Sequence, residues 1–429
     1  MRTFTWVGTL VALAIPVLAA CSGSGSDGAS SSGSAGMPNG GIGATGAAGA
    51  AGAAGAGQAG AGQAGAGQAG AGQAGAGQAG GTTSPAGNPN GSCSAGVPAR
   101  GKPVDTTHPT TVVGTGTAAS CTFSALDDAV AKGGIVTFDC GSAPATIAVS
   151  ATVNVPADKD TVIDGGDRVT LDGGNAVQIL RFYSANFRAN EHGLTLQHLA
   201  LRNGKTTPTE AIPVADAPCS QGFNDGEGGA LYMRDGGLTV IDSVFDSNHG
   251  APLGPDTGGG AIYVVGSKPG VMIVGSTFTN NDASNGGGIG CLFAELNIYN
   301  SLFTGNKAIG HDANNNEPSK CSAMNNGQNE TGSGGNGGPI YSDGASVNVT
   351  LCGDEITDNH AGVKAFGGGL FFTSNDMMGT LTISDTTMTD NTGGSWTSVS
   401  TGSVKNVGTA VGVNAKSISV SNSTLQGYP

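Results

Sequence analysis

The sequence predicts an all-β fold in which short strands wind into a solenoid behind one short helix. Three apolar residues, separated by two and then five positions, form a template that recurs seven times. In five copies an Asn follows the third apolar residue by three positions, and five Gly-rich turns each precede a short apolar run. No window keeps a period of 3.6 residues, which excludes a helical solenoid.

Each copy of the template indicates a strand, a bend and a second strand. Two alternate apolar residues are typical of a short strand with one buried face, and the third apolar residue begins another buried face. The triplets are Leu194, Leu196, Leu201; Leu238, Val240, Phe245; Val271, Ile273, Phe278; Leu296, Ile298, Phe303; Val349, Leu351, Ile356; Leu381, Ile383, Met388; and Ile418, Val420, Leu425. The second bend residue is His198 in the first copy and Gly, Asn or Asp in all others, types that tolerate a left-handed backbone.

The recurring Asn marks one fixed corner of the coil. We expect each of these residues to turn the chain and to stack its amide on the next copy, as a hydrogen-bonded ladder. The ladder residues are Asn248, Asn281, Asn306, Asn359 and Asn391.

The Gly-rich turns precede a third strand in each coil. They open the runs GGALYM (228–233), GGAIYV (259–264), GGGIGC (286–291), GGPIYS (337–342) and GGGLFF (367–372). Gly lets the chain turn and lets backbones approach closely. Successive template copies lie 25 to 53 residues apart, and the excess over the shortest period falls in loops at 202–226 and 307–336. Such insertions are typical of a solenoid.

The pairs GGALYM with FDSN, GGAIYV with FTNN, and GGGIGC with FTGN resemble the repeats of bacterial polymorphic outer-membrane proteins. Over residues 190–429 the chain resembles the right-handed parallel β-helix, or pectin-lyase-like, superfamily. The resemblance implies an all-β right-handed parallel β-helix solenoid with a short N-terminal capping helix. It does not imply an activity, because lyases, hydrolases, adhesins and tailspikes share the fold. The GHG and RIK patterns of polygalacturonases and the RxPxxR pattern of pectate lyases are absent from the sequence.

Residues 93–189 are predicted to form the N-terminal cap and the entry strands. The run SALDDAVAKGG (124–134) predicts a helix that starts with a capping box at Ser124 and stops at Gly133–Gly134. Leu126, Ala129 and Val130 lie on its apolar face, which would cover the open end of the coil.

Seven Cys follow Cys21, an odd number, so at least one of them does not pair within the chain. Cys121 and Cys140 bracket the predicted helix and are candidates for one disulfide. Cys219 and Cys321 lie in the two long loops and are candidates for a second. The sequence alone does not determine their connectivity.

Residues 1–20 form an export signal, an Arg followed by an apolar run too short to span a membrane. The stretch LAAC (18–21) resembles the lipobox of bacterial lipoproteins, which implies cleavage before Cys21 and lipidation of that Cys. An ordinary cleavage site with a chance Cys is the alternative. Residues 21–92 then form the lipidated Cys and a disordered Gly/Ala/Gln/Ser linker. The expected location is the cell envelope, at the outer membrane or cell surface, with membrane contact only through the lipid.

The net charge of −14 argues against nucleic acid and anionic lipid as partners. It leaves metal ions, neutral glycans and proteins.

Two groups of residues are candidates for chemistry. His249, Asp282, Lys307 and His360 directly follow the corner Asn residues, so they would stack along one edge about 4.8 Å apart and could do acid–base work. The alternative, a row of solvated turn residues, is favoured because corners are exposed.

The acidic residues before the Gly-rich turns are the second group, and they offer oxygen ligands that suit calcium. Calcium is the one cofactor that the sequence suggests. The favoured alternative is that these are acidic loops that keep the protein soluble. The residues are Asp225, Glu227, Asp256 and Asp312.

The sequence thus favours surface binding or adhesion, to a glycan or a cell-surface protein, over catalysis. The alternatives are a polysaccharide lyase or glycoside hydrolase of the same fold, and a purely structural surface module. A groove beside the two long loops, with convergent carboxylates, would favour the enzyme.

Overall fold

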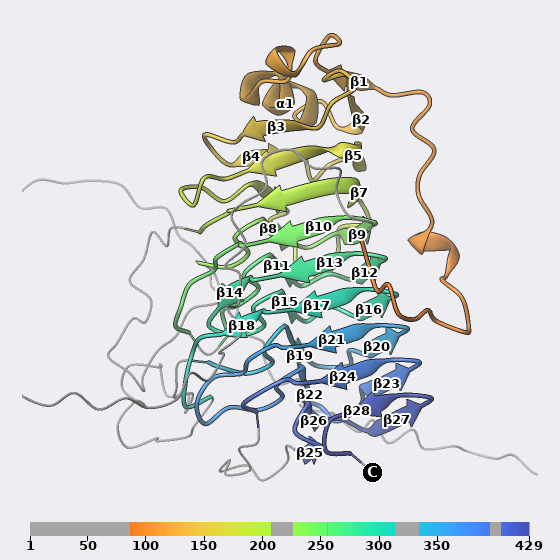
Figure 1. Cartoon of the computed structure of the whole chain (residues 1–429), viewed down its shortest axis with the longest axis vertical. Helices are drawn as coiled ribbons and strands as arrows, with labels where there is room; N and C mark the ends of the chain where they lie inside the picture. Colours follow the sequence, from red (N-terminus) through yellow and green to blue (C-terminus); the bar gives the residue numbers. More distant parts are fainter. Residues whose placement is uncertain (1–85, 207–225, 255, 314–333, 395–404, 429) are drawn as a thin grey trace, which may run out of the picture. The chain divides into compact units, whose positions relative to one another are not determined.

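The computed structural model describes residues 86–206, 226–254, 256–313, 334–394 and 405–428. These residues form a parallel β-solenoid with one short α-helix, which confirms the predicted fold class (Figure 1). None of the helices in the described ranges is long and apolar enough to cross a membrane. Several predictions concern residues outside the described ranges: the signal at 1–20, Cys21, most of the linker at 21–92, Cys219, Asp225 and Cys321.

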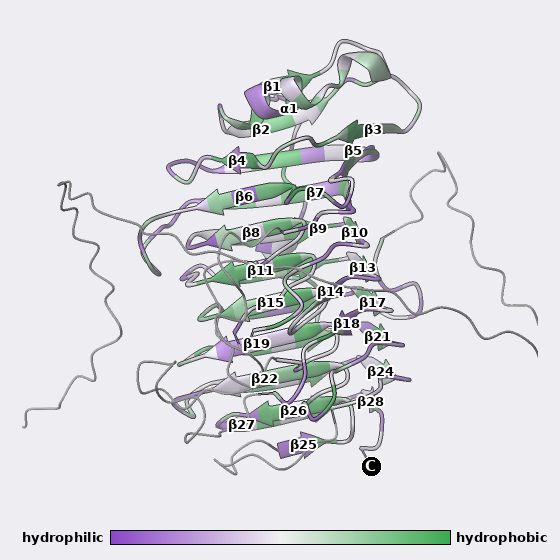
Figure 2. Cartoon of the chain, turned by 90° about the vertical axis from the view of Figure 1, so that its left-hand side faces the viewer, coloured by the Kyte–Doolittle hydropathy of each residue, from purple (hydrophilic) through white to green (hydrophobic). Residues whose placement is uncertain are grey.

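The strands form two long sheets and a small third one. The first sheet holds β1 (Thr111–Val113), β2 (Gly134–Phe138), β3 (Ala145–Ala148), β5 (Thr161–Asp172), β7 (Gly193–Arg202), β9 (Gly237–Ile241), β10 (Val244–Asp246), β12 (Val271–Val274), β13 (Thr277–Thr279), β16 (Leu296–Tyr299), β17 (Leu302–Thr304), β20 (Val349–Cys352), β21 (Glu355–Thr357), β23 (Thr380–Ser384), β24 (Thr387–Thr389), β27 (Ser417–Ser421) and β28 (Thr424–Leu425). The second holds β4 (Val153–Val155), β6 (Leu180–Tyr183), β8 (Leu231–Arg234), β11 (Ile262–Val265), β15 (Ile289–Leu292), β19 (Ile340–Gly344), β22 (Leu370–Ser374), β25 (Lys405–Val407) and β26 (Val411–Asn414), and faces the viewer in Figure 2. The third pairs β14 (Asp282–Ala283) with β18 (Lys307–Ala308).

The apolar template sets the register of the stack. Leu238 pairs with Leu194 on one side and with Val271 on the other, and the later copies pair in the same way. These side chains point into one continuous core. The Phe245, Phe278 and Phe303 rings stack in this core, with centroids 4.8 and 4.7 Å apart and planes 4° from parallel.

The bend residue has a positive φ in every copy of the template, from 44° at Asp242 to 75° at Gly353. His198 has the same left-handed backbone, with φ 50°, and His is, after Asn and Asp, a non-Gly residue type that is enriched there. The expectation that the corner Asn turns the chain is wrong. The turn is made one residue earlier, at Ser247, Asn280, Gly305, Asp358 and Asp390, which all have φ between 55° and 70°.

The capping helix α1 (Phe123–Val130) lies at the end of the stack next to β1 and β2 (Figure 1). Its buried residues are Leu126, Ala129 and Val130, as predicted. The predicted start at Ser124 is wrong, because the N-cap is Thr122, whose hydroxyl accepts a hydrogen bond from the Ala125 amide at 3.2 Å. The Cys121–Cys140 disulfide joins the residue before this cap to the segment that directly follows β2.

Residues 86–106 form a strap that crosses several rungs of the first sheet (Figure 1). Its Arg100 donates hydrogen bonds to the backbone oxygens of Leu238 and Gly270 at 2.9 and 2.8 Å. A disulfide joins Cys93 to Cys352, a pairing that the sequence did not predict. The predicted linker boundary at residue 92 is too late, since Asn88 already donates its side-chain amide to the Gly353 oxygen. Cys291 is buried and unpaired.

Candidate functional site

A buried amide ladder holds the corner of the coil in place. In each step the Asn side-chain oxygen accepts from both the backbone amide and the side-chain amide of the Asn in the preceding rung. Asn281 Oδ1 accepts in this way from Asn248 at 2.9 Å for both bonds. Asn306, Asn359 and Asn391 repeat the pattern, with bonds of 2.9 to 3.1 Å. Every residue after the ladder is therefore displayed at the same place in its rung.

The residues that directly follow the ladder form one continuous row, here called the corner row. Parallel backbone bridges link its members in order: Lys205, His249, Asp282, Lys307, His360 and Thr392. The four residues predicted to stack along this edge are thus brought together. Lys205 and Thr392 extend the row, and both could have been found by alignment: Thr392 follows Asn391, and Lys205 follows Gly204, whose amide caps the ladder.

The side chains of the corner row offer both donors and acceptors to solvent. His249 Nδ1 lies 2.8 Å from Asp282 Oδ2, and these two side chains are 31% and 28% exposed. The His360 ring is hydrogen-bonded to the Thr392 hydroxyl through Nδ1. Lys307 is exposed and forms no ion pair with any residue in the described ranges. A ligand could therefore meet a carboxylate, an ammonium group and two imidazoles along one line.

Exposed apolar side chains lie beside this row. Ile309 is 43% exposed and Val363 is 73% exposed. His311 forms a parallel backbone bridge with Val363. The carboxylate of the next residue, Asp312, pairs with the His311 ring at 2.7 Å and with the Lys364 ammonium group at 3.0 Å. Burial opposes ionisation of Asp312, but these two partners hold its pKa below the ordinary value.

The described acidic residues proposed as calcium ligands, Glu227, Asp256 and Asp312, do not form a common cluster of ligand atoms. Asp312 forms ion pairs with His311 and Lys364. Asp256 instead accepts a hydrogen bond from the hydroxyl of Tyr341, which lies on the second sheet. Within the described ranges, the only three potential ligand atoms that lie together are the disulfide sulfurs of Cys93 and Cys352 with Asp385. The described residues therefore do not assemble the predicted calcium site.

Glu227 and Asp256 instead lie beside buried phenols. Tyr232, Tyr263 and Tyr341 occupy one row of the second sheet, with Gly290 between the last two. The Tyr263 hydroxyl donates to the Asp256 backbone oxygen at 2.5 Å, and the Tyr341 hydroxyl lies 3.1 Å from Asp343 Oδ2. Burial raises the pKa of Tyr263 and Tyr341 well above the ordinary value, and the carboxylates of Asp256 and Asp343 add to both shifts. Glu227 adds to the pKa shift of Tyr263. These carboxylates converge on buried side chains, not on an open groove.

No protein-family model, curated protein or solved structure matches this chain. The described residues form a parallel β-solenoid, and proteins of unrelated function share this architecture. Function must therefore be argued from the surface residues themselves.

Proposed function

We propose that this protein is a lipid-anchored, extracytoplasmic β-solenoid that binds an extended glycan along the corner row. The observation that carries the proposal is the row itself, which presents one polar side chain per rung from Lys205 to Thr392. With rungs about 4.8 Å apart, the six members span about 24 Å. A linear polymer lying along the stack would meet a hydrogen-bonding group at every step.

The chemistry of the row suits a polysaccharide better than a highly charged polymer. Sugar hydroxyls donate to the Asp282 carboxylate and accept from Lys307 and from the His side chains. The exposed Ile309 and Val363 side chains offer apolar surface for the C–H faces of sugar rings. The net charge of −14 disfavours nucleic acid, and a row with both signs of charge does not select for it.

The proposed location rests on two features. The LAAC stretch resembles a lipobox, and two disulfides suit an oxidising compartment. Conversion of Cys21 to Ser tests the anchor. The protein should then leave the membrane fraction, and unchanged fractionation would contradict lipidation.

The binding test uses the purified protein and a panel of neutral and acidic polysaccharides, with and without calcium. Retention on at least one polysaccharide is expected, and the double variant Lys307→Ala/His360→Ala should lower it at least fivefold. The matched control is Lys416→Ala, an exposed Lys outside the row, which should bind as the unmodified protein does. Absence of retention on the whole panel would overturn the proposal and favour a structural module or a protein-binding adhesin.

A second candidate function, polysaccharide cleavage, is favoured by the bond between His249 and Asp282. A carboxylate that fixes one ring nitrogen orients the imidazole for proton transfer. The same assay therefore records reducing and unsaturated ends. Release of such ends that disappears in His249→Ala and in Asp282→Ala would establish an enzyme, whereas retention without release supports the binding module.

A further inference from the structure

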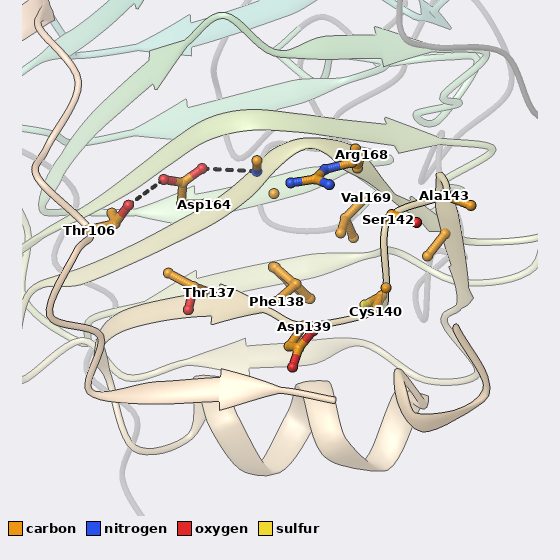
Figure 3. Close-up of a pocket in the computed structure, with 14 residues that line it drawn as sticks. Thr106, Thr137, Phe138, Asp139, Cys140, Ser142, Ala143, Asp164, Arg168 and Val169 are labelled. Carbon is orange, nitrogen blue, oxygen red and sulfur yellow. Dashed lines mark hydrogen bonds between the residues drawn. The ribbon is translucent and has the colours of Figure 1, made fainter. Parts of the chain in front are cut away.

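A cavity of about 500 Å³ lies where the cap meets the first coils, away from the residues of the corner row. Its walls come from β2, from residues 139–145 and from the bend of β5 (Figure 3). The volume lies within the range of roughly 300–1,000 Å³ that is usual for small-molecule sites.

An insertion in a single rung creates this cavity. The pairing of β5 with β7 shifts register between Asp164 and Val169, so four residues of β5 oppose the single bend residue His198. These four, Gly165 to Arg168, form a bulge that overhangs the segment 139–145. Bulges of this kind re-aim side chains and occur often beside functional sites.

The wall of the cavity is held rigidly around Asp164. Its Oδ2 accepts hydrogen bonds from the Thr106 hydroxyl at 2.7 Å and the Gln197 amide at 3.0 Å. Its Oδ1 accepts from the Gly166 amide at 3.0 Å and lies 3.1 Å from His198 Nδ1. Burial works against ionisation of Asp164, but these bonds lower its pKa, so the carboxylate is a fixed support. On the opposite side the Cys121–Cys140 disulfide fixes Cys140.

Other polar groups of the lining remain available to a ligand. Arg168 and Asp139 lie on opposite walls, with Phe138 and Val169 between them (Figure 3). Neither charged side chain forms an ion pair or a side-chain hydrogen bond with another described residue. The Thr137 and Ser142 hydroxyls also line the cavity. Both side chains are exposed to solvent, so a ligand can pair with a guanidinium donor and a carboxylate acceptor at once.

We propose that this pocket binds one neutral sugar unit, through hydroxyls that donate to Asp139 and accept from Arg168. A hydroxyl can do both, so neighbouring hydroxyls match the two walls without burying a net charge. The pocket is a second glycan subsite, which rests on the proposed glycan-binding function but uses none of the corner-row residues. It would accept a chain end or a single branching unit, because its lining comes from one bend and one loop and is not repeated from rung to rung.

The test measures binding of glucose, galactose, mannose and N-acetylglucosamine to the full protein by saturation-transfer NMR, followed by titration calorimetry. At least one sugar is expected to bind, and Arg168→Gln and Asp139→Asn should each weaken it at least fivefold. Ala143→Trp, which fills the recess, should abolish binding. The control is Asp128→Asn, an exposed carboxylate on the capping helix outside the lining.

Unaltered affinity in both Arg168→Gln and Asp139→Asn would overturn the assignment, as would binding of none of the four sugars. The free amino acid glycine, a zwitterion, is the comparison ligand. If it binds and the four sugars do not, the sugar assignment is wrong and the pocket binds an amino acid. The Lys307→Ala/His360→Ala protein should still bind the monosaccharide, which separates this pocket from the corner row. If the unmodified protein binds a monosaccharide but is retained on no polysaccharide, the corner-row proposal is wrong and the pocket proposal stands. If it is retained on a polysaccharide but binds no monosaccharide, the pocket proposal is wrong and the corner-row proposal stands.

Discussion

Asp354 accepts a hydrogen bond from the backbone amide of Ser301, with 2.8 Å between Oδ1 and N. In the neighbouring rungs a hydroxyl makes the same contact to the preceding rung. The hydroxyl residues are Ser243, Ser276, Ser301, Thr386 and Ser423. Asp354 is therefore the one carboxyl in a second buried ladder, and burial raises its pKa to about 8 despite the amides of Ser301 and Cys352.

We expect the stability contributed by Asp354 to fall as the pH rises. The folded protein keeps a proton on this carboxyl up to about pH 8, whereas the unfolded chain releases it near pH 4. The contribution is therefore complete below about pH 4 and is lost progressively up to about pH 8. Asp354→Ser restores the hydroxyl of the neighbouring rungs and should flatten this part of the profile. Urea midpoints at pH 5, 7 and 9 measure it, and parallel profiles for the two proteins would contradict the expectation.

Removal of one amide from the corner ladder should strongly destabilise the coil. Asn281→Ala leaves the Asn248 amides without their acceptor and the Phe245 oxygen without its donor, all in a buried site. Unsatisfied buried groups cost about 1–3 kcal/mol each, so we expect a loss of at least about 3 kcal/mol. Urea unfolding measures the loss. Asn297→Ala, on the outer side of β16, should change stability by less than about 0.5 kcal/mol; similar losses in the two variants would show that the ladder contributes little.

The two disulfides should differ in their effect on stability, because they close loops of very different length. Cys93 and Cys352 are 259 residues apart, and Cys121 and Cys140 are 19 apart. Chain-entropy estimates are about 5.5 kcal/mol for the first and about 3 kcal/mol for the second. We expect Cys93→Ala/Cys352→Ala to lower the urea midpoint more than Cys121→Ala/Cys140→Ala. The opposite order would indicate that local packing at the cap dominates.

The stacked phenyl rings should tolerate an aliphatic side chain but not a cavity. Ile356 and Met388 already occupy the Phe278 position in later rungs. We therefore expect Phe278→Leu to lower the free energy of unfolding by about 1–2 kcal/mol and Phe278→Ala by about 3–5 kcal/mol. Chemical unfolding of both variants measures the difference. Equal losses would mean that ring stacking, and not filled volume, stabilises the row.

Register could be predicted from sequence because every rung repeats the same pattern. A strand that buries Leu238 and Val240 can place both inside only if it pairs in phase with Leu194 and Leu196, since a slip of one residue would expose them. The corner row follows from that register. The hydroxyl ladder is equally visible in the sequence, because a Ser or Thr directly follows the bend residue in most rungs.

The strap and the cap pocket could not be predicted, because neither is periodic. The partner of Cys93 depends on where the strap crosses the stack, and no repeat constrains that path. The run DGGDR (164–168) reads as part of a strand, and only its pairing with the next rung reveals the bulge. The pocket then depends on how that bulge meets residues 139–145, and both segments precede the first copy of the repeated template.

The bond between Cys93 and Cys352 also determines how the chain carries mechanical tension. All residues between these two cysteines lie in a covalently closed loop. A pull applied before Cys93 and after Cys352 passes from sulfur to sulfur and does not enter the loop. The capping helix, the bulge of β5 and Lys307 of the corner row are therefore shielded from that force. A solenoid held through its amino-terminal segment is loaded at the rung of Cys352, far from its capped end, so stretching cannot peel the first coils away.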